Sequence, residues 1–434
     1  MAHSLNNGTA DAQERAAPLL PNDAEALKSE DVILDLSGSG AAAAGAEGRS
    51  EPTCFVPPEG ITVNELVKLN NLAPYDAANP AVPLTSDNSF VGSNGYRLHH
   101  REWHPAGPPG NVKAVVFWFH GIGAHVNRST ERLLSALFTA KGWALFALDF
   151  EGHGYSEGRA RTYVKGNRWQ TYVADADTFV RKLYAERFGH WRSPPPLFVF
   201  AESMGGAVAL HLGLRYQRIA SQLGKGPGVP GAPLVGGGGG GGSRGAAGER
   251  LPLAAASAYA PVLRAFRGVV TVSAAIEGDL PPKPVIWFLR YGLAPFFPRW
   301  IPCFMPHPIT PERVTRDATL RESRSVDYLS NCGKPFRLGT GVMLLNLLSA
   351  TQKALGDVAF PFCAVHGGAD AAVPCNGSRR LFKASATRAC DKRLVVVEGG
   401  YHDLLHDPLW RRAVGGVVGW IEERVNTPAF PGLQ

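Results

Sequence analysis

Short apolar runs alternate with longer segments through the first half of the chain. Three runs rich in Val, Phe, Leu and Ala are typical of strands buried on both faces: Lys113–Phe119, Ala144–Leu148 and Leu197–Ala201. The segments that follow these runs are predicted helices: Thr130–Lys141, Tyr172–Phe188 and Met204–Gln217. Phe90–Val91 and Tyr96–Trp103 are predicted to pair as strands across an Asn94-Gly95 turn. Strands and helices that alternate at these lengths predict βαβ crossovers and a mostly parallel sheet.

The same alternation returns further along the chain. Three more strands and a last helix are predicted: Arg267–Ala274, Pro361–His366, Arg393–Glu398 and Trp410–Val425. Residues 275–350 do not alternate but read as helical, aromatic and punctuated by proline, which predicts a helical lid inserted into the sheet domain. Residues 223–250 include the seven consecutive glycines Gly236–Gly242, which predict a flexible surface insertion. We therefore predict one α/β core in two halves, residues 86–274 and 351–434.

Composition changes the picture at the N-terminus. Residues 1–85 are acidic, rich in Ala, Gly and Ser, and without a sustained period, which predicts a mostly disordered tail. The chain has a formal charge of +7, and residues 1–60 alone carry −7, so the remainder carries +14. A cationic body suits an anionic membrane surface, or is diffuse surface charge that favours solubility. No basic stripe interleaved with aromatics is present, which disfavours nucleic acid as a partner.

The six cysteines form no CxxC pair, and no His, Cys, Asp and Glu cluster has metal-ligand spacing. We therefore predict no metal and no cofactor, and reduced thiols in an intracellular setting. The N-terminus lacks the apolar stretch of a signal peptide, and no window of about 18 residues is uninterruptedly apolar. These features predict a cytoplasmic protein without a transmembrane helix.

The strongest chemical signal lies where the third buried strand runs directly into a helix. The segment Phe200–Gly206 places Ser203 at this turn, with a glycine two residues later. Such a strand–serine–helix turn presents the serine hydroxyl at the N-terminus of the helix. The usual motif also has glycine two residues before the serine, where this chain has Ala201. We predict that Ser203 is a nucleophile; the alternative is an ordinary helix N-cap.

A serine nucleophile needs a base, and the base needs a third group that orients it. Asp370 follows the strand Pro361–His366, and His402 follows the strand Arg393–Glu398. Ligands gather at the carboxyl edge of such sheets, so both side chains are expected near the serine. The chain order serine, acid, histidine is the one that this arrangement uses. His406, one helical turn after His402, is the alternative base.

An oxyanion hole needs two backbone N–H groups. One is predicted at Met204, directly after the serine, and the other at Ile122, in the loop His120–Gly123 after the first buried parallel strand. Three histidines near these loops are interpreted as structural: His120, His153 and His366. The side chain of Glu202 is expected to point away from the serine.

Together these motifs resemble those of monoacylglycerol lipases, which are serine hydrolases of the α/β-hydrolase superfamily. The matching segments lie within residues 86–425: His120–Gly123, Asp149–Gly158, Glu202–Gly206, Gly367–Asp370 and Tyr401–His402. The end of the predicted lid, Val326–Tyr328 and Val342–Leu348, is similar to the helix that closes the cap of that family. The chain departs from the family at Ala201 and at Val373, where some members have a cysteine.

The resemblance implies an α/β-hydrolase fold and hydrolysis of monoacylglycerols to glycerol and a fatty acid without metal or cofactor. It also implies peripheral contact of the cap with a membrane or lipid-droplet surface. The lid window Val285–Ile301 is dense in aromatics, and residues 281–340 carry a charge of +5. These aromatics pack on the core, line an acyl channel or rest on lipid headgroups.

Other functions remain open at this stage. A lysophospholipase, a broader carboxylesterase or a glycerolipid acyltransferase would use the same residues. His402 and Asp407 fit the H-x4-D spacing that some acyltransferase relatives have. A catalytically silent binding protein of the same fold is the alternative outside enzymes, although such proteins usually lose a triad member. The sequence leaves the oligomeric state open.

Overall fold

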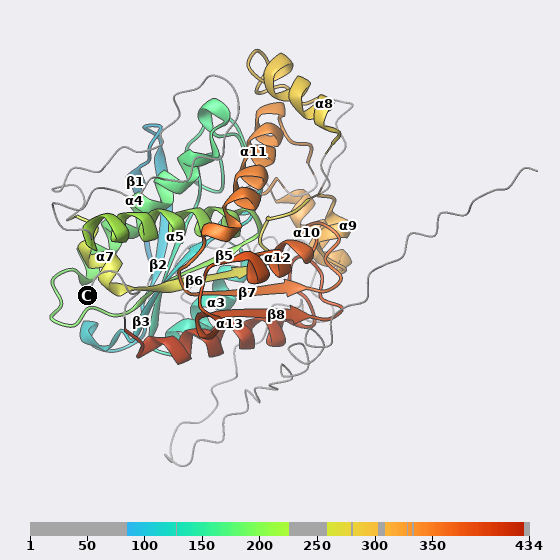
Figure 1. Cartoon of the computed structure of the whole chain (residues 1–434). Coiled ribbons are helices and arrows are strands. Elements are labelled where there is room, and N and C mark those ends of the chain that lie inside the picture. Colours follow the sequence, from blue (N-terminus) through green and yellow to red (C-terminus); the bar gives the residue numbers. More distant parts are fainter. Residues whose placement is uncertain are drawn as a thin grey trace, which may run out of the picture. The chain divides into compact units, whose positions relative to one another are not determined.

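The structure is a computed structural model, and it describes residues 85–428 apart from residues 127, 225–257, 279–280, 303–308, 328 and 332–333. Residues 1–84 of the predicted tail and the run of glycines therefore lie outside the described residues, and Thr85, assigned to the tail, begins the first strand. The described strands form one sheet in the order β1-β2-β4-β3-β5-β6-β7-β8 (Figure 1). Their bounds are β1 Thr85–Val91, β2 Arg97–Trp103, β3 Ala114–Phe119, β4 Trp143–Leu148, β5 Leu197–Glu202, β6 Phe266–Val272, β7 Phe362–Gly367 and β8 Lys392–Val397.

The sheet is antiparallel only at the edge formed by its first two strands. β1 pairs with β2 and β2 with β4 in antiparallel fashion, and all pairings from β4 onward are parallel. Each strand predicted from the apolar pattern is present, and β1 begins earlier than its short apolar run suggested. Gly95 has a φ of 80° in the turn between β1 and β2, a conformation that glycine adopts without strain. The prediction of a mostly parallel sheet is confirmed.

Helices cover both faces of the sheet (Figure 1). One face packs against α3 (Ser129–Ala140) and α13 (Trp410–Val425). The other face packs against five helices: α4 Trp169–Phe188, α5 Ser203–Gly224, α7 Ala260–Ala265, α11 Leu338–Ala354 and α12 Asn376–Ala384. Successive side chains of β3 divide between the two cores, because side chains alternate along a strand. Phe117 packs with α4 and α5, whereas Trp118 packs with α3 and α13.

The segment between β6 and β7, residues 273–361, is called here the β6–β7 segment. Its described elements are helical, in agreement with the pattern of residues 275–350: α8 Lys283–Trp287, the π-helix η3 Phe288–Leu293, α9 Pro311–Val314, α10 Ala318–Val326, α11 and the 3-10 turn η4 Leu355–Asp357. Further 3-10 turns are η1 Pro109–Asn111, η2 Lys165–Asn167 and η5 Ala389–Asp391. Within the ranges that the structure describes, no helix is both long and apolar enough to cross a bilayer.

Candidate active site

Ser203 lies at a sharp turn between a strand and a helix. β5 ends at Glu202, and α5 begins at Ser203, whose φ is 52°. This left-handed conformation is unusual for a residue with a side chain, and such strain concentrates at functional sites. A Cβ on Gly205 would lie only 2.4 Å from the carbonyl oxygen of Phe119, so α5 passes β3 at a distance that only glycine permits. Ala201, which replaces the usual glycine, is accommodated in the buried core.

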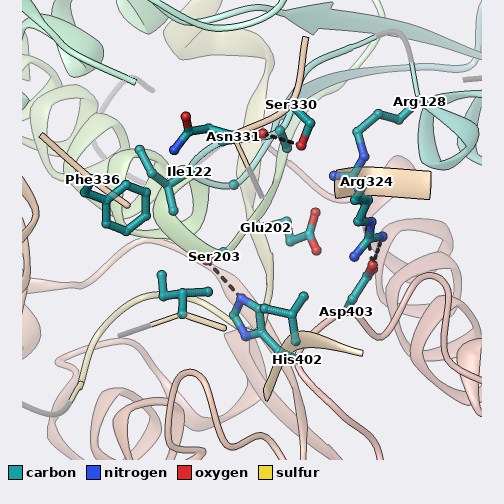
Figure 2. Close-up of a pocket in the computed structure, with 15 residues that line it drawn as sticks. Ile122, Arg128, Glu202, Ser203, Arg324, Ser330, Asn331, Phe336, His402 and Asp403 are labelled. Atoms are coloured by element: carbon teal, nitrogen blue, oxygen red, sulfur yellow. Dashed lines mark hydrogen bonds and ion pairs between the residues drawn. The ribbon is translucent and has the colours of Figure 1, made fainter. Parts of the chain in front are cut away.

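The structure brings the three predicted catalytic side chains together, and Figure 2 shows Ser203 beside His402. His402 Nε2 lies 3.1 Å from Ser203 Oγ, and His402 Nδ1 lies 2.7 Å from Asp370 Oδ2. All three residues are buried. Because a carboxylate only accepts, His402 Nδ1–H donates to Asp370, which leaves Nε2 free to accept the proton of the serine hydroxyl. This is the geometry of a serine nucleophile with its base and orienting acid.

Asp370 is fixed through both of its oxygens. Oδ1 accepts the backbone N–H groups of Ala372 and Val373 at 2.9 and 2.8 Å. Oδ2 accepts from His402 and lies 3.2 Å from His366 Nε2. Burial alone would raise the pKa of Asp370, but the charge of His402 and the hydrogen bonds from both histidines outweigh burial and hold the pKa below its ordinary value. Asp370 is therefore an ionised acceptor for His402.

The surroundings of His402 stabilise the imidazolium that forms when the ring takes a proton. Burial disfavours the imidazolium, but Asp370, Glu202 and Asp403 outweigh burial and raise the pKa of His402 above its ordinary value. A stronger base takes a proton from a hydroxyl more readily. The carboxylates around His402 thus suit it to general base catalysis.

The three histidines interpreted as structural make contacts within the loops around the site; they are His120, His153 and His366. His120 Nδ1–H donates to the carbonyl of Gly121 at 2.7 Å, and its Nε2 accepts the N–H of Phe150 at 3.2 Å. His153 Nδ1–H donates to the carbonyl of Glu151. Burial lowers the pKa of His120 to about 4 and that of His153 to about 3, so both rings are neutral near pH 7. His366 is buried behind Asp370 and contacts Ser378 and the carbonyl of Val373.

The two predicted oxyanion donors lie beside the serine. Ile122 directly follows Gly121, where an added Cβ would lie 3.1 Å from the Cβ of Ser203. Met204 follows Ser203 in the first turn of α5, where backbone N–H groups have no partner within the helix. Ile122 also lines the pocket onto which the serine opens (Figure 2).

This pocket has an apolar side and a charged side. Its apolar lining from the β6–β7 segment is Ile309, Val314 and Phe336. Its charged lining is Arg128, Glu202, Arg324 and Asp403. The remaining lining residues come from the loops around the serine and from the β6–β7 segment: Gly121, Ile122, Gly123, Ala124, Ser203, Ser330, Asn331 and His402.

The charged side is a connected cluster centred on Asp403. Arg324 donates to Asp403 Oδ2, and His406 Nδ1 lies 2.8 Å from Asp403 Oδ1. The carboxylate of Glu202 points away from Ser203 toward Arg324, as expected from the sequence (Figure 2). Burial, and then the charge of Asp403, raise the pKa of Glu202. His406, the alternative base, belongs to this cluster, because its Nδ1 contacts Asp403 and Arg324, whereas His402 holds the position beside the serine.

Sequence reasoning missed Arg324 and Asp403. Asp403 had a signal, because it directly follows the catalytic candidate His402. Arg324 had none, because it lies 79 residues before its partner, in a segment without strand and helix alternation.

Asp407, which completes the H-x4-D spacing, holds the loop that carries His402. Its Oδ2 accepts from Arg316 at 3.0 Å and from the N–H of Tyr401 at 3.2 Å, and its Oδ1 accepts the N–H of Leu409 at 3.0 Å. These contacts give Asp407 a structural task. Among the described residues, no group of three or more His, Cys, Asp and Glu side chains is arranged to hold a metal ion.

The sheet order, the serine turn and the hydrogen-bonded serine, histidine and aspartate together define an α/β-hydrolase. The chain belongs to the family described as serine aminopeptidase, S33, whose model matches residues 110–234 and 251–409. It is similar to the monoglyceride lipase of Mus musculus, with 25% identity over 353 residues that cover 79% of this chain and 93% of the relative. It is equally similar to the monoacylglycerol lipase of Mycolicibacterium smegmatis, with 25% identity over 336 residues, 77% of this chain and 96% of the relative.

Solved structures agree on the fold. A soluble variant of monoglyceride lipase from Saccharomyces cerevisiae aligns with a TM-score of 0.56 and 17% identity, over 82% of this chain and all of that one. The monoacylglycerol lipase of Paleococcus ferrophilus aligns with a TM-score of 0.53 and 18% identity, over 75% of this chain and 99% of that one. The family and the relatives make this protein a serine hydrolase of the lipase and esterase type.

Proposed function

We propose that the protein hydrolyses the ester bond of monoacylglycerols to glycerol and a free fatty acid. The observation that carries this proposal is the hydrogen-bonded chain from Ser203 through His402 to Asp370 at the wall of one pocket. The relatives named monoglyceride and monoacylglycerol lipases support the choice of substrate.

The proposed mechanism proceeds through an acyl-enzyme. Ser203 Oγ attacks the ester carbonyl while His402 Nε2 takes its proton, and Asp370 orients the imidazole and stabilises its cation. The N–H groups of Ile122 and Met204 bind the oxyanion that develops on the carbonyl oxygen. Glycerol leaves with the proton from His402. A water molecule, activated by the same histidine, then attacks the acyl-enzyme and releases the fatty acid.

We assign the two sides of the pocket to the two parts of the substrate. Ile309, Val314 and Phe336 offer an apolar surface for the acyl chain, because apolar area removed from water stabilises the complex. The charged cluster around Asp403 offers a polar environment for the glycerol hydroxyls. The β6–β7 segment supplies the apolar wall and thus acts as the lid in this proposal.

The same segment is proposed to meet a lipid surface. Five aromatic side chains on or near α8 and η3 are more than half exposed: Trp287, Phe288, Tyr291, Phe296 and Phe297. Clustered exposed aromatics are costly in water and are typical of interaction surfaces. With the charge of +5 on residues 281–340, they suit an anionic bilayer or lipid-droplet surface. A cytoplasmic protein that attaches reversibly to such surfaces would reach its substrate there.

The substrate proposal is tested with the purified full chain on a panel of monoacylglycerols, diacylglycerols and lysophospholipids. We expect monoacylglycerols to give the highest kcat/KM and Ser203→Ala to abolish glycerol release. A preference for lysophospholipids, or transfer of the acyl group to an alcohol in preference to water, would replace this proposal with one of the alternatives. Absence of turnover on every ester would favour a silent binding protein.

The surface proposal is tested by sedimentation with vesicles that contain phosphatidylserine. Trp287→Ser combined with Phe296→Ser should weaken binding, and salt should weaken it further, because screening reduces attraction between exposed charges. Val91→Ser is the matched control, since Val91 is 65% exposed on β1, outside the aromatic cluster. Equal binding of the double variant and the control would contradict the assignment of this surface.

A further inference from the structure

The loop that carries the candidate oxyanion donor Ile122 is held from two directions. The hydrolase core holds its ends: His120 donates to the carbonyl of Gly121, and Asp149 Oδ1 accepts the N–H of Val126 at 2.8 Å. The middle of the loop contacts the β6–β7 segment instead. The carbonyl of Gly123 accepts the N–H of Asn331 at 2.9 Å and the hydroxyl of Ser330 at 3.1 Å.

A buried hydrogen bond between two side chains completes this contact. His125 Nε2 lies 2.9 Å from Asp327 Oδ2, although the two residues are 202 positions apart in the chain. The other oxygen, Asp327 Oδ1, accepts the N–H of Leu329 at 2.9 Å. Burial alone would raise the pKa of Asp327, but the hydrogen bond and charge of His125 outweigh burial and hold it below its ordinary value. Asp327 is thus a carboxylate that ties its own turn to the oxyanion loop.

The backbones themselves are in close contact at Gly123. Its φ is 73°, and an added Cβ would lie 3.2 Å from the Cβ of Asn331 and 3.4 Å from the carbonyl carbon of that residue. The loop therefore has little room to move toward the β6–β7 segment, and the hydrogen bonds at Gly123 prevent it from moving away. Its position is set by the segment as much as by the core.

We propose that Asp327, Ser330 and Asn331 are positioning residues that hold the oxyanion loop, and with it the N–H of Ile122, in place for catalysis. The inference rests on the proposed role of Ile122 in ester hydrolysis, but not on the choice of monoacylglycerol as substrate. Loss of one oxyanion donor typically lowers kcat by about 100- to 1,000-fold, and small misplacements of reacting groups also cost much of the rate. None of the three residues needs to touch the substrate for this effect.

The decisive variant is Asp327→Asn. Since the Leu329 N–H needs an acceptor, the amide oxygen of the new side chain stays at Oδ1 and its NH2 group faces His125 Nε2. The hydrogen bond to a carboxylate is then lost, and only a bond between neutral groups can replace it, after the ring proton of His125 moves to Nδ1. With p-nitrophenyl butyrate as substrate we expect kcat to fall by about 10- to 100-fold and KM to change by less than about twofold. Ser330→Ala removes a single hydroxyl and should give a smaller loss of the same kind.

The matched control is Glu102→Gln. Glu102 is a buried carboxylate on β2 that is ion-paired with Arg187 at 2.9 Å and contacts His104, and both of these partners lie outside the oxyanion loop. This variant should lose thermal stability without losing kcat. A kcat loss in Asp327→Asn at a melting temperature like that of the control therefore reports positioning and not general destabilisation.

A pair of inhibitors tests directly how well the oxyanion hole stabilises a negative charge. A trifluoromethyl ketone with a decyl chain forms a tetrahedral oxyanion on the active serine, whereas the matching secondary alcohol does not. Asp327→Asn and Ser330→Ala should weaken inhibition by the ketone in proportion to their loss of kcat and leave binding of the alcohol unchanged. An unchanged kcat, or equal weakening of both inhibitors, would overturn the inference. If Asp327→Asn does not fold, Ser330→Ala alone tests the inference, through its kcat and through its inhibition by the ketone relative to the alcohol.

The outcome is separate from that of the substrate proposal. If the wild-type protein hydrolyses p-nitrophenyl butyrate but no monoacylglycerol, the substrate assignment fails while this test still runs. If the variants match the wild type on both inhibitors while monoacylglycerols are hydrolysed, the positioning role alone fails.

Discussion

Replacing Asp370 by asparagine changes one atom of the site and should reverse one hydrogen bond. Asp370 Oδ1 accepts two backbone N–H groups, so the amide oxygen of the introduced asparagine would occupy this position. Its NH2 group would then face His402 Nδ1, which is now 2.7 Å from Oδ2. A donor at this point forces Nδ1 to accept, and the ring proton moves to Nε2, which faces Ser203 Oγ at 3.1 Å. In that tautomer the histidine cannot take the serine proton.

The size of the effect follows from the loss of general base catalysis. In other serine hydrolases with this arrangement the same change lowers kcat by about 10,000-fold, which is about 5.5 kcal/mol of activation free energy. We expect a loss of this order for Asp370→Asn in steady-state hydrolysis of monoacylglycerol. Asp370 is also a main cause of the raised pKa of His402. Without its charge, burial dominates, the pKa of His402 falls, and the acid limb of kcat/KM moves to lower pH.

Glu102→Gln is the control for this experiment as well. Glu102 is also a buried carboxylate, but its partners Arg187 and His104 lie outside the loops that carry Ser203, Asp370 and His402. Its amide variant should lose stability and keep kcat within a few-fold. If Asp370→Asn kept more than about a tenth of the wild-type kcat, the assignment of Asp370 as the orienting acid would be refuted.

Three further predictions concern stability, each measured by urea denaturation. Gly205→Ala places a Cβ against carbonyl oxygens at the end of β3 and should cost at least about 3 kcal/mol of stability. Gly415→Ala in α13 is the control: nothing lies within 4 Å of the new Cβ, so it should stabilise by about 1 kcal/mol. Equal effects would contradict the close approach of α5 to β3. Arg324→Gln removes the nearer of two arginines from buried Asp403, which keeps His406 and, at 3.9 Å, Arg128. The change should cost about 2 kcal/mol, and a neutral change would remove this ion pair from the account. The pKa values of His120 and His153 are lowered from 6.5 to about 4 and about 3, so below pH 6.5 the unfolded chain binds protons that the folded state does not. The free energy of unfolding should therefore decrease as the pH is lowered below 6.5, by up to about 1.4 kcal/mol per pH unit for each ring. A flat profile down to about pH 5 would contradict their burial as neutral rings.

The parts of the fold that the sequence predicts are those in which a local pattern and the final burial coincide. β3, β4 and β5 are buried on both faces, so their apolar runs are nearly continuous and leave little ambiguity. Ser203, Asp370 and His402 are then found by their places after strands, because parallel strands bring their carboxyl ends to one edge. By contrast, α12 was not predicted as a separate helix, because its buried positions are Gly377, Ser378 and Leu381, which form no apolar stripe.

The charged cluster and the contacts to the oxyanion loop depend on how the β6–β7 segment folds back. The contact of Asp327 with His125 joins residues 202 positions apart, and neither residue stands out in its local sequence. The same holds for position 123. It requires glycine partly because Asn331, which is distant in the sequence, lies against it. Such contacts are consequences of packing, and no periodicity or motif in a single sequence carries them.

The central claim is that Ser203 is the single nucleophile of this enzyme. A fluorophosphonate probe that reacts with activated serines tests it most directly, with the modified residue located by mass spectrometry of the digested protein and the remaining monoacylglycerol hydrolysis measured in parallel. The account predicts one adduct per chain, on Ser203, and loss of hydrolysis in proportion to labelling. An adduct on another residue, or hydrolysis that persists after complete labelling of Ser203, would contradict it.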